Sequence, residues 1–471
     1  MLLAGLLVLA AAVRFAGLGH QSFWLDEAFT ERLLRHSFGD MLNVLPDSES
    51  TPPLYYVLAW PWARIFGFGE AGLRSLSALA GTLTVLAGWA AARRLAGPAA
   101  ALATAAVLAV HPLLVWFSQE ARAYALATLF AALSLWCWAA LVQRGGRRWW
   151  IGWAAASAAA LATHYFAAFL VAGEAAYLLW RAPDRRAVLL ACAPVAAVGA
   201  ALAPLALAQR RTGNTAYISE EGLGRRLVQV PKQLLVGYAS PGQAVTAVLA
   251  VLLVAVALNA LRRRDAPAGG RRALALAAFA ILVPAALAVV GLDYFNGRNV
   301  LMALPALAVA IGAGLTTLRR PLAVSALAVL LLVVTVLDAT DTRYQREDWR
   351  GAARALGPEH GARIVVATPS SADIALAPYL PTVTRLAPTG ASVSEIDLLA
   401  IPLRSTGSGS QPPPRPAVAP RLPPQFVPAG RTLGARFTVL RFRAPAPQPV
   451  RPAQLTGDGL APGAVTVLLQ P

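Results

Sequence analysis

Two adjacent carboxylates, Asp26 and Glu27, follow the first apolar run of the chain in the string FWLDEAFT. Trp24 and Phe29 flank them, and the string TPPLYY follows at residues 51–56. Ionisable groups beside lipid are costly, so an acidic pair at the end of a membrane helix favours a functional site. A carboxylate there can take a proton from a hydroxyl group that attacks a substrate carbon. The plainer alternative is two solvated acids at the membrane interface.

Three other polar strings place arginine or histidine beside aromatic residues. HPLLVWFSQEARAY ends with Glu120, Arg122 and Tyr124, THYFA contains His164, and DYFNGRN contains Tyr294 and Arg298. Guanidinium groups bind phosphate through paired hydrogen bonds, and they stabilise the negative charge that grows on a leaving phosphate. A carboxylate pair together with separate arginines therefore predicts sugar transfer from a lipid-linked phosphate to a hydroxyl group.

The composition is that of an integral membrane protein. Of 471 residues, 57% are hydrophobic and only 14% are charged, whereas a soluble domain carries about 25% charged residues. The net charge of +18 could suggest a nucleic-acid partner. However, the arginines form short clusters between apolar runs, as the positive-inside rule requires, so no nucleic-acid partner is expected. Cys137 and Cys192 lie inside apolar runs, which indicates neither a disulfide framework nor a zinc site.

Eleven apolar runs are long enough, or nearly so, for a membrane-spanning helix of about 20 residues. They are 2–19, 71–92, 98–116, 123–142, 149–164, 166–181, 187–208, 243–261, 273–291, 299–318 and 321–338. Arginine clusters follow every second span, which predicts a cytoplasmic N-terminus and one consistent cytoplasmic side. The acidic and aromatic segments 20–70, 117–122, 209–242 and 292–298 then face outward, as does the tail. We take the first run as a retained span and not as a signal peptide.

The predicted architecture is an all-α polytopic membrane domain at 1–338, followed by a small extracytoplasmic α/β domain at 339–471. Outer loop 20–70 is expected to form short helices at the membrane surface, and GLGRRLVQVPKQLLVGY to form another interfacial helix. In the tail, EDWRGAARAL predicts a helix, while RIVVAT, RFTVLRF and AVTVLL predict strands. The proline-rich stretch 403–430 is interpreted as a linker or long loop.

Seven strings together resemble one family of membrane enzymes. They are LDEAFT, TPPLYYVL, LRSLSALAG, FSQEARAYAL, THYFA, YFNGRNVLMALPAL and YQREDWRGAARAL. Over about residues 1–370 the chain resembles the GT-C superfamily, specifically glycosyltransferase family 39 and its bacterial relatives. These include protein O-mannosyltransferases and the aminoarabinose transferases that modify lipid A.

The resemblance implies a role for each candidate residue. Asp26 would be the catalytic carboxylate and Glu27 a second acidic group, while Arg122 and Arg298 would hold the donor phosphate. The expected substrate-binding residues are Arg122, Arg298, Tyr124, Glu120, His164, Tyr55 and Tyr294. No obligatory metal is expected, because Asp26 and Glu27 alone are not a coordination set, although a divalent metal is left open by relatives of this architecture.

Structural roles remain open for several of these residues. Glu120 and Arg122 can simply pair with each other, and His164 can cap a helix or bind a carbonyl. Arg14 lies late in the first span, where snorkelling to the interface is the ordinary interpretation and a phosphate contact the alternative. Glu174, inside a span, is expected to be a buried structural partner.

The predicted function is a membrane glycosyltransferase that moves a sugar from a polyprenyl-phosphate donor, with inversion, on the outer face of the cytoplasmic membrane. The acceptor hydroxyl belongs to a glycan, a lipid or a protein, and membrane lipid surrounds the chain. The alternative is a polytopic transporter or lipid flippase, which should carry polar residues near the bilayer midplane. Here they gather at one end of the helices. A third interpretation, a membrane-anchored binding protein whose tail does the work, leaves the polar outer loops unexplained.

Overall fold

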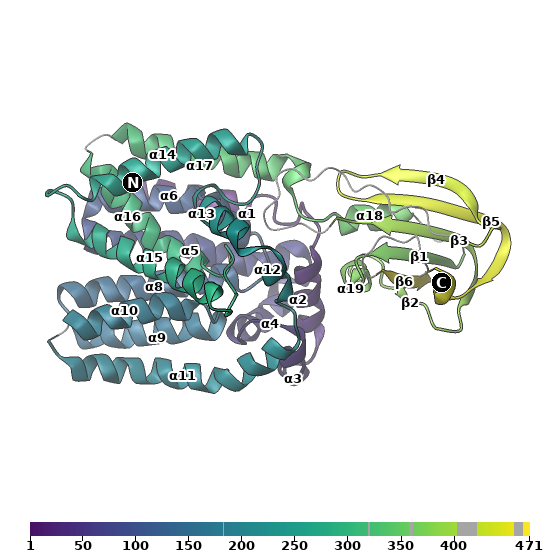
Figure 1. Ribbon diagram of the computed structural model, residues 1–471, viewed down its shortest axis with the longest axis horizontal. Helices are drawn as coiled ribbons and strands as arrows, with labels where there is room; N and C mark the ends of the chain where they lie inside the picture. Colours follow the sequence, from purple (N-terminus) through teal and green to yellow (C-terminus); the bar gives the residue numbers. More distant parts are fainter. Residues whose placement is uncertain (182, 319–320, 358–360, 403–421, 456–464) are drawn as a thin grey trace. The chain divides into compact units, whose positions relative to one another are not determined.

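The computed structural model describes residues 1–471 except 182, 319–320, 358–360, 403–421 and 456–464. The chain folds as two compact units (Figure 1). One consists of residues 1–18 and 33–337, and the other of residues 19–32 and 338–471. We call them the helical unit and the sheet unit. The expected division at 338 stays a prediction, and the structure groups segment 19–32 with the tail and not with loop 20–70.

Helices make up most of the helical unit. They are α1 (Leu2–Phe15), α3 (Phe38–Ser48), α4 (Leu54–Phe66), α5 (Glu70–Ala96), α6 (Pro98–Val110), α7 (Pro112–Ser118), α8 (Tyr124–Gln143), α9 (Arg147–Thr163), α10 (Ala167–Arg181), α11 (Arg185–Arg211), α12 (Ala216–Glu220), α13 (Leu223–Val236), α14 (Gln243–Ala260), α15 (Ala268–Val289), η1 (Leu301–Ala303), α16 (Leu304–Thr317) and α17 (Pro321–Thr340). Helix α2 (Leu25–Arg35) begins in the sheet unit and ends in the helical unit.

Membrane-spanning helices are present, as the composition predicted. Among the described residues, six helices are long and apolar enough to cross a membrane, and the bent pair α6–α7 raises this to seven. Each of the eleven predicted runs contains a helix or a helix pair, but α1, α9, α10 and α16 are shorter than a full span. The chain is therefore a multi-pass membrane protein, and the count of eleven stays a prediction.

Small residues let the helices of this unit approach closely. Helix α16 is almost entirely buried and packs against α5, α6, α14 and α15, which lie beside it (Figure 1). A side chain at Gly314 would meet the Ala257 carbonyl oxygen at 2.0 Å, and one at Gly312 would meet Thr104 Oγ1 at 2.6 Å. Such contacts are typical of membrane helices, whose association depends on close packing and not on exclusion of water.

The sheet unit contains one six-stranded sheet in the order β2-β6-β1-β3-β5-β4 (Figure 1). Its strands are β1 (Arg363–Thr368), β2 (Thr384–Arg385), β3 (Ala391–Ala400), β4 (Val427–Leu433), β5 (Thr438–Val450) and β6 (Thr466–Gln470). Strands β1 and β3 are parallel and the other pairs are antiparallel. Helices α18 (Trp349–Leu356) and α19 (Ala372–Leu376) and the 3-10 helices η2 (Thr342–Tyr344) and η3 (Pro452–Gln454) also belong to this unit.

The tail differs from its prediction at two places. Strand β3 was not predicted, because Glu395 and Asp397 interrupt its apolar pattern and acidic residues are rare in strands. Strand β4 begins at Val427, so the end of the expected linker 403–430 is a strand paired with β5. Residues 403–421 of that stretch lie outside the described residues. The three predicted strands and the helix after residue 346 are confirmed.

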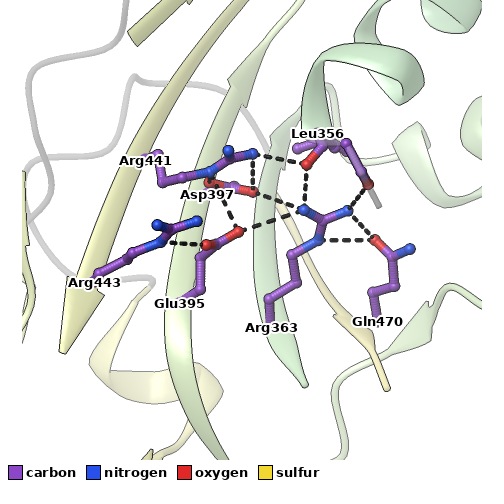
Figure 2. A network of polar contacts seen from close by, with 8 residues as sticks. Leu356, Arg363, Glu395, Asp397, Arg441, Arg443 and Gln470 are labelled. Carbon is purple, nitrogen blue, oxygen red and sulfur yellow. Dashed lines mark hydrogen bonds and ion pairs between the residues drawn. The ribbon is translucent and has the colours of Figure 1, made fainter. Parts of the chain in front are cut away.

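The two acidic residues of β3 belong to an ionic network across the sheet (Figure 2). Arg441 Nε donates to Asp397 at 3.0 Å, and Arg443 Nε donates to Glu395 at 2.7 Å. Arg363 lies 3.4 Å from Glu395 and donates to Gln470 at 2.9 Å. Burial raises the pKa of Asp397 to about 6. The network therefore ties β1, β3, β5 and β6 together through side chains as well as the backbone.

Candidate active site

The predicted acidic pair begins helix α2. Asp26 and Glu27 lie in its first turn, where the positive end of the helix dipole stabilises carboxylates. Glu27 is fully buried, and its carboxylate accepts a hydrogen bond from the Trp24 backbone N–H at 3.4 Å. Asp26 is partly buried. The first turn thus presents one enclosed carboxylate and one that is accessible to solvent.

Residues at the start of the tail, more than 320 positions later in the sequence, contact this turn directly. Glu347 accepts hydrogen bonds from the Leu25 backbone N–H at 3.1 Å and from Trp349 Nε1 at 3.0 Å. The Glu347 carbonyl accepts from Ser22 Oγ at 2.7 Å, and Tyr379 Oη accepts from the Phe23 N–H at 2.7 Å. The strings FWLDEAFT and YQREDWRG therefore form one substructure, with Glu347 as the side chain that caps α2.

In the helical unit, Arg122 is held by a carboxylate that the sequence did not single out. Its two terminal nitrogens donate to the two Glu49 oxygens at 2.7 and 2.9 Å, and both side chains are nearly buried. Glu49 is the C-cap residue directly after helix α3. Glu120, the expected alternative partner, is itself buried. A bidentate carboxylate on Arg122 occupies the same hydrogen-bond donors that a phosphate would use.

A polar chain continues from Glu49 into the TPPLYY segment. Tyr56 Oη lies 3.3 Å from Thr51 Oγ1, and Gln209 Nε2 donates to the Thr51 carbonyl at 3.0 Å. The Gln209 side-chain oxygen accepts from Tyr165 Oη at 2.8 Å. The predicted residue Tyr55 is buried, with its ring 5.3 Å from that of Tyr56. The start of α4 is therefore joined to α11 and to the turn after α9.

Four of the predicted substrate-binding residues lie in one aromatic cluster. The Tyr124 ring is 5.4 Å from His164, and Arg298 Cζ lies 5.9 Å from the Tyr124 centroid. Phe166 links His164 to Tyr294, at 5.7 and 5.8 Å between ring centroids. Arginine over an aromatic face within about 6 Å is an attractive arrangement. These residues come from α8, the turn after α9 and the loop before η1.

A second ion pair beside this cluster was missed from the sequence. Arg226 on α13 binds both oxygens of Asp293, and it donates to the Phe295 carbonyl at 2.8 Å. The hydrogen bond from Arg226 lowers the pKa of Asp293 below its ordinary value. Asp293 is five residues from Arg298, so this pair anchors the loop that carries Arg298. Arg226 follows another arginine in an amphipathic helix, where nothing local distinguishes it from a surface charge.

The predicted residues thus form two described groups. Asp26 and Glu27 belong to the sheet unit, and the other group belongs to the helical unit: Arg122, Arg298, Tyr124, Glu120, His164, Tyr55 and Tyr294. Their roles stay predictions. Among the described parts of the chain, no three His, Cys, Asp or Glu side chains are arranged so that they could hold a metal ion.

Glu174 is the buried structural partner that was expected inside a span. Its carboxylate accepts hydrogen bonds from Trp153 Nε1 at 2.8 Å and Ser134 Oγ at 3.4 Å, and its carbonyl accepts from Trp138 Nε1 at 3.2 Å. The residue joins α8, α9 and α10 in the helix core. Its contacts account for a carboxylate in an apolar helix without a catalytic role.

Comparison with known proteins gives a family match over the middle of the helical unit. Residues 50–208 match the family described as dolichyl-phosphate-mannose-protein mannosyltransferase. This stretch contains Glu120, Arg122, Tyr124 and His164. The comparison with curated proteins finds no match.

Several solved structures resemble the chain. Apo ArnT from Cupriavidus metallidurans is 17% identical, with a TM-score of 0.50 over 76% of this chain and 65% of ArnT. The oligosaccharyltransferase AglB from Archaeoglobus fulgidus, in complex with an inhibitory peptide and a dolichol-phosphate, is 13% identical, with a TM-score of 0.47 over 76% and 58%. ArnT from Cupriavidus metallidurans bound to undecaprenyl phosphate is 13% identical, with a TM-score of 0.43 over 93% and 97%.

The fold comparison rests on apo ArnT, and the aligned region spans slightly less than two thirds of the length of that protein. At this level of identity the likeness concerns the fold: a mostly helical membrane unit followed by a small sheet domain. The family match adds a sequence-based relation that includes the FSQEARAY and THYFA strings. The resemblance is confirmed, and the chain is similar to the GT-C membrane glycosyltransferases of the protein mannosyltransferase type.

Proposed function

We propose that this protein is a glycosyltransferase that moves a sugar from a polyprenyl-phosphate donor to an acceptor hydroxyl at the outer face of the cytoplasmic membrane. The observation that carries the proposal is the aromatic and arginine cluster of Tyr124, His164 and Arg298. Two of its members lie inside the stretch that matches the mannosyltransferase family. The description of that family names a dolichyl-phosphate sugar donor.

The proposed reaction is a single displacement with inversion at the anomeric carbon. The Asp26 carboxylate takes the proton of the acceptor hydroxyl while the hydroxyl oxygen bonds to the anomeric carbon. The bond from that carbon to the phosphate oxygen breaks, and its electron pair leaves on the phosphate. Arg298 stabilises the charge that grows there. Phosphate is a good leaving group, so the mechanism needs no separate acid.

Asp26 suits the role of base better than Glu27. The Glu27 side chain is buried and accepts a backbone hydrogen bond, so it supports the first turn of α2. Asp26 is more accessible, and the contacts of Glu347 with Leu25 and Trp349 hold the turn that carries it. The donor phosphate is assigned to Arg298 because its guanidinium lies beside Tyr124 in the aromatic cluster, whereas two nitrogens of Arg122 bind Glu49.

The proposal includes a topology of eleven spans with a cytoplasmic N-terminus. Residues 1–338 are the transmembrane domain, and the sheet domain after residue 338 lies on the outer side. The alternating arginine clusters support this orientation. A nucleotide-sugar donor is not available outside the cell, which favours a polyprenyl carrier. The acceptor is a glycan, a lipid or a protein, and the sugar is left open.

Lipid profiling of a deletion strain tests the function. The strain should accumulate a polyprenyl-phosphate sugar, and the wild-type gene should remove it. The Asp26→Asn variant should reach the membrane in normal amounts and fail to remove the lipid. The matched control, Asp40→Asn, changes an exposed carboxylate of α3 and should complement fully. Complementation by Asp26→Asn would exclude the proposed base. The absence of any accumulating sugar lipid would count against the enzyme and favour a transporter.

A further inference from the structure

Helices α6 and α7 form one broken element with a bend of 57° at His111 and Pro112. In an unbroken helix, the N–H groups of residues 112, 113 and 114 would bind the carbonyls of residues 108, 109 and 110. Pro112 has no N–H group, and the bend turns the next two away from the axis of α6. Three carbonyl groups in the interior of the membrane unit therefore need other donors.

Two side chains from distant helices supply these donors. Arg14 on α1 donates to the Leu108 carbonyl at 2.9 Å and to the Ala109 carbonyl at 2.6 Å. Thr335 on α17 donates to the Val110 carbonyl at 2.8 Å. All three carbonyls exposed by the break are thus paired. The bend is held by tertiary contacts and does not depend on Pro112 alone.

Arg14 is fully buried, contrary to the snorkelling side chain expected from its place in the sequence. Besides the two carbonyls of α6, it donates to Ser118 Oγ at 3.2 Å and to the Ala10 carbonyl at 3.1 Å. Among the described residues it uses four distinct oxygen acceptors, which compensates for the removal of a charge from water. The phosphate contact considered as an alternative is not needed to explain its position.

The neighbouring helix leaves space for this arrangement. A side chain at Gly81 of α5 would come within 2.0 Å of Ser118 Oγ and 2.9 Å of Arg14 Nε. Real side chains do not approach so closely, so Arg14 and Ser118 would have to move. The absence of a side chain at Gly81 therefore allows the contact between Arg14 and Ser118.

The contacts of Arg14 also fix the end of α7, which connects to the proposed substrate site. Ser118 ends α7, and the next residue, Gln119, donates to the carbonyls of Val13 at 3.1 Å and Ala16 at 3.0 Å. Arg122 follows three residues later, and Tyr124 begins α8. The last turn of α1 thus holds the end of α6 and the end of α7, and thereby the segment that leads to Tyr124, whose ring lies 5.9 Å from Arg298 Cζ.

We propose that Arg14 is a positioning residue: it fixes the bend between α6 and α7 and so places segment 118–124 for binding of the donor phosphate. This inference rests on the proposed function. It predicts that fold stability and phosphate binding depend on Arg14 in two separable ways. Stability needs donors for the Leu108 and Ala109 carbonyls, whereas binding needs the bend itself.

The test compares Arg14→Leu with the double variant Arg14→Leu/Pro112→Ala in the full-length protein in lipid nanodiscs. The probe is undecaprenyl phosphate alone. Arg14→Leu should lower the thermal unfolding midpoint and weaken binding at least about tenfold. In the double variant, loss of the proline ring restores a backbone N–H for the Leu108 carbonyl, so the midpoint should recover while binding stays weak. The control Arg210→Leu, which removes an exposed arginine of α11, should change neither quantity.

Two results would overturn the inference: unchanged probe binding in Arg14→Leu, or recovery of both quantities in the double variant. A cryo-EM structure of the double variant gives a readout that does not depend on binding. It should show α6 and α7 straightened and segment 118–124 displaced, and an undisplaced segment would contradict the positioning role. If the wild type does not bind the probe, the proposed donor is wrong, and the structure of the double variant still decides the role of Arg14.

Discussion

Replacing Glu49 by glutamine tests whether Arg122 is mainly a structural residue or a phosphate ligand. The Arg122–Glu49 pair is bidentate, and only 9% and 4% of the two side chains are exposed. Removing one partner of a buried ion pair costs about 3–5 kcal/mol, because a desolvated charge is left without compensation. Glutamine keeps the shape and one oxygen acceptor, so we expect the lower end, about 3 kcal/mol.

A double-mutant cycle measures this coupling. The free energy of unfolding is compared for wild type, Glu49→Met, Arg122→Met and the double variant Glu49→Met/Arg122→Met, with Glu49→Gln measured beside them. Each single variant should lose about 3 kcal/mol, and the apolar double variant should recover most of it, because a buried ion pair is often replaced by hydrophobic residues without loss. The control is Asp265→Asn, whose pair with Arg263 is about half exposed and contributes about 0–1 kcal/mol.

The same variants bear on the site. Glu49→Gln removes the charged carboxylate that accepts from two nitrogens of Arg122, so affinity for undecaprenyl phosphate should rise, whereas Arg122→Met alone should change it little. A Glu49→Gln variant as stable as the wild type would refute the reasoning about burial. A large loss of affinity in Arg122→Met with Glu49 present would show that the phosphate displaces Glu49.

Three further predictions concern the surrounding residues. Arg298→Ala should raise the KM for the lipid donor about tenfold or more and change the KM for the acceptor little, because a charge-assisted hydrogen bond to the phosphate is lost. The control is Arg225→Ala, which removes an exposed arginine of α13. Equal effects on the KM for donor and acceptor would count against the assignment of Arg298. Asp293→Asn should lower the free energy of unfolding at pH 7, because Arg226 lowers the pKa of Asp293. The stability that Asp293 contributes is present above its ordinary pKa and is lost as the pH falls through the lowered pKa. A destabilisation by Asp293→Asn that grows as the pH falls would contradict the Arg226 pair. Glu174→Ala should lower the free energy of unfolding by about 1–3 kcal/mol for each hydrogen-bond donor that it leaves unpaired. Glu174→Gln should keep most of the stability and full transfer activity. Loss of activity at normal stability would contradict a purely structural role.

Elements defined by local pattern were predictable from the sequence. Apolar runs of sufficient length coincide with helices such as α5, α8 and α14, because a backbone in lipid must satisfy its own hydrogen bonds. The helical spacing of apolar residues in 223–236 indicated α13, and the short apolar run at 363–368 indicated β1. These signals depend on neighbours a few residues away, which a sequence displays directly.

Parts of the candidate site were also visible locally. The strings around Asp26, Arg122, His164 and Arg298 combine charged and aromatic residues at the ends of apolar runs, an arrangement too costly in lipid to be kept without a use. Arg122 and His164 lie in the stretch 50–208 that matches the family, and His164 and Arg298 both lie beside the Tyr124 ring. Their catalytic roles await the experiments above.

Only the tertiary structure decided which charges are partners. Arg122 meets Glu49 across 73 residues, Arg226 meets Asp293 across 67, and Arg14 meets the broken helix 94 residues away. The sequence left a pair with Glu120 open for Arg122 and indicated the lipid interface for Arg14, and it did not single out Glu49. A long, flexible arginine side chain can reach many acceptors, and the choice among them is made by the packing of helices that have no local signal for one another.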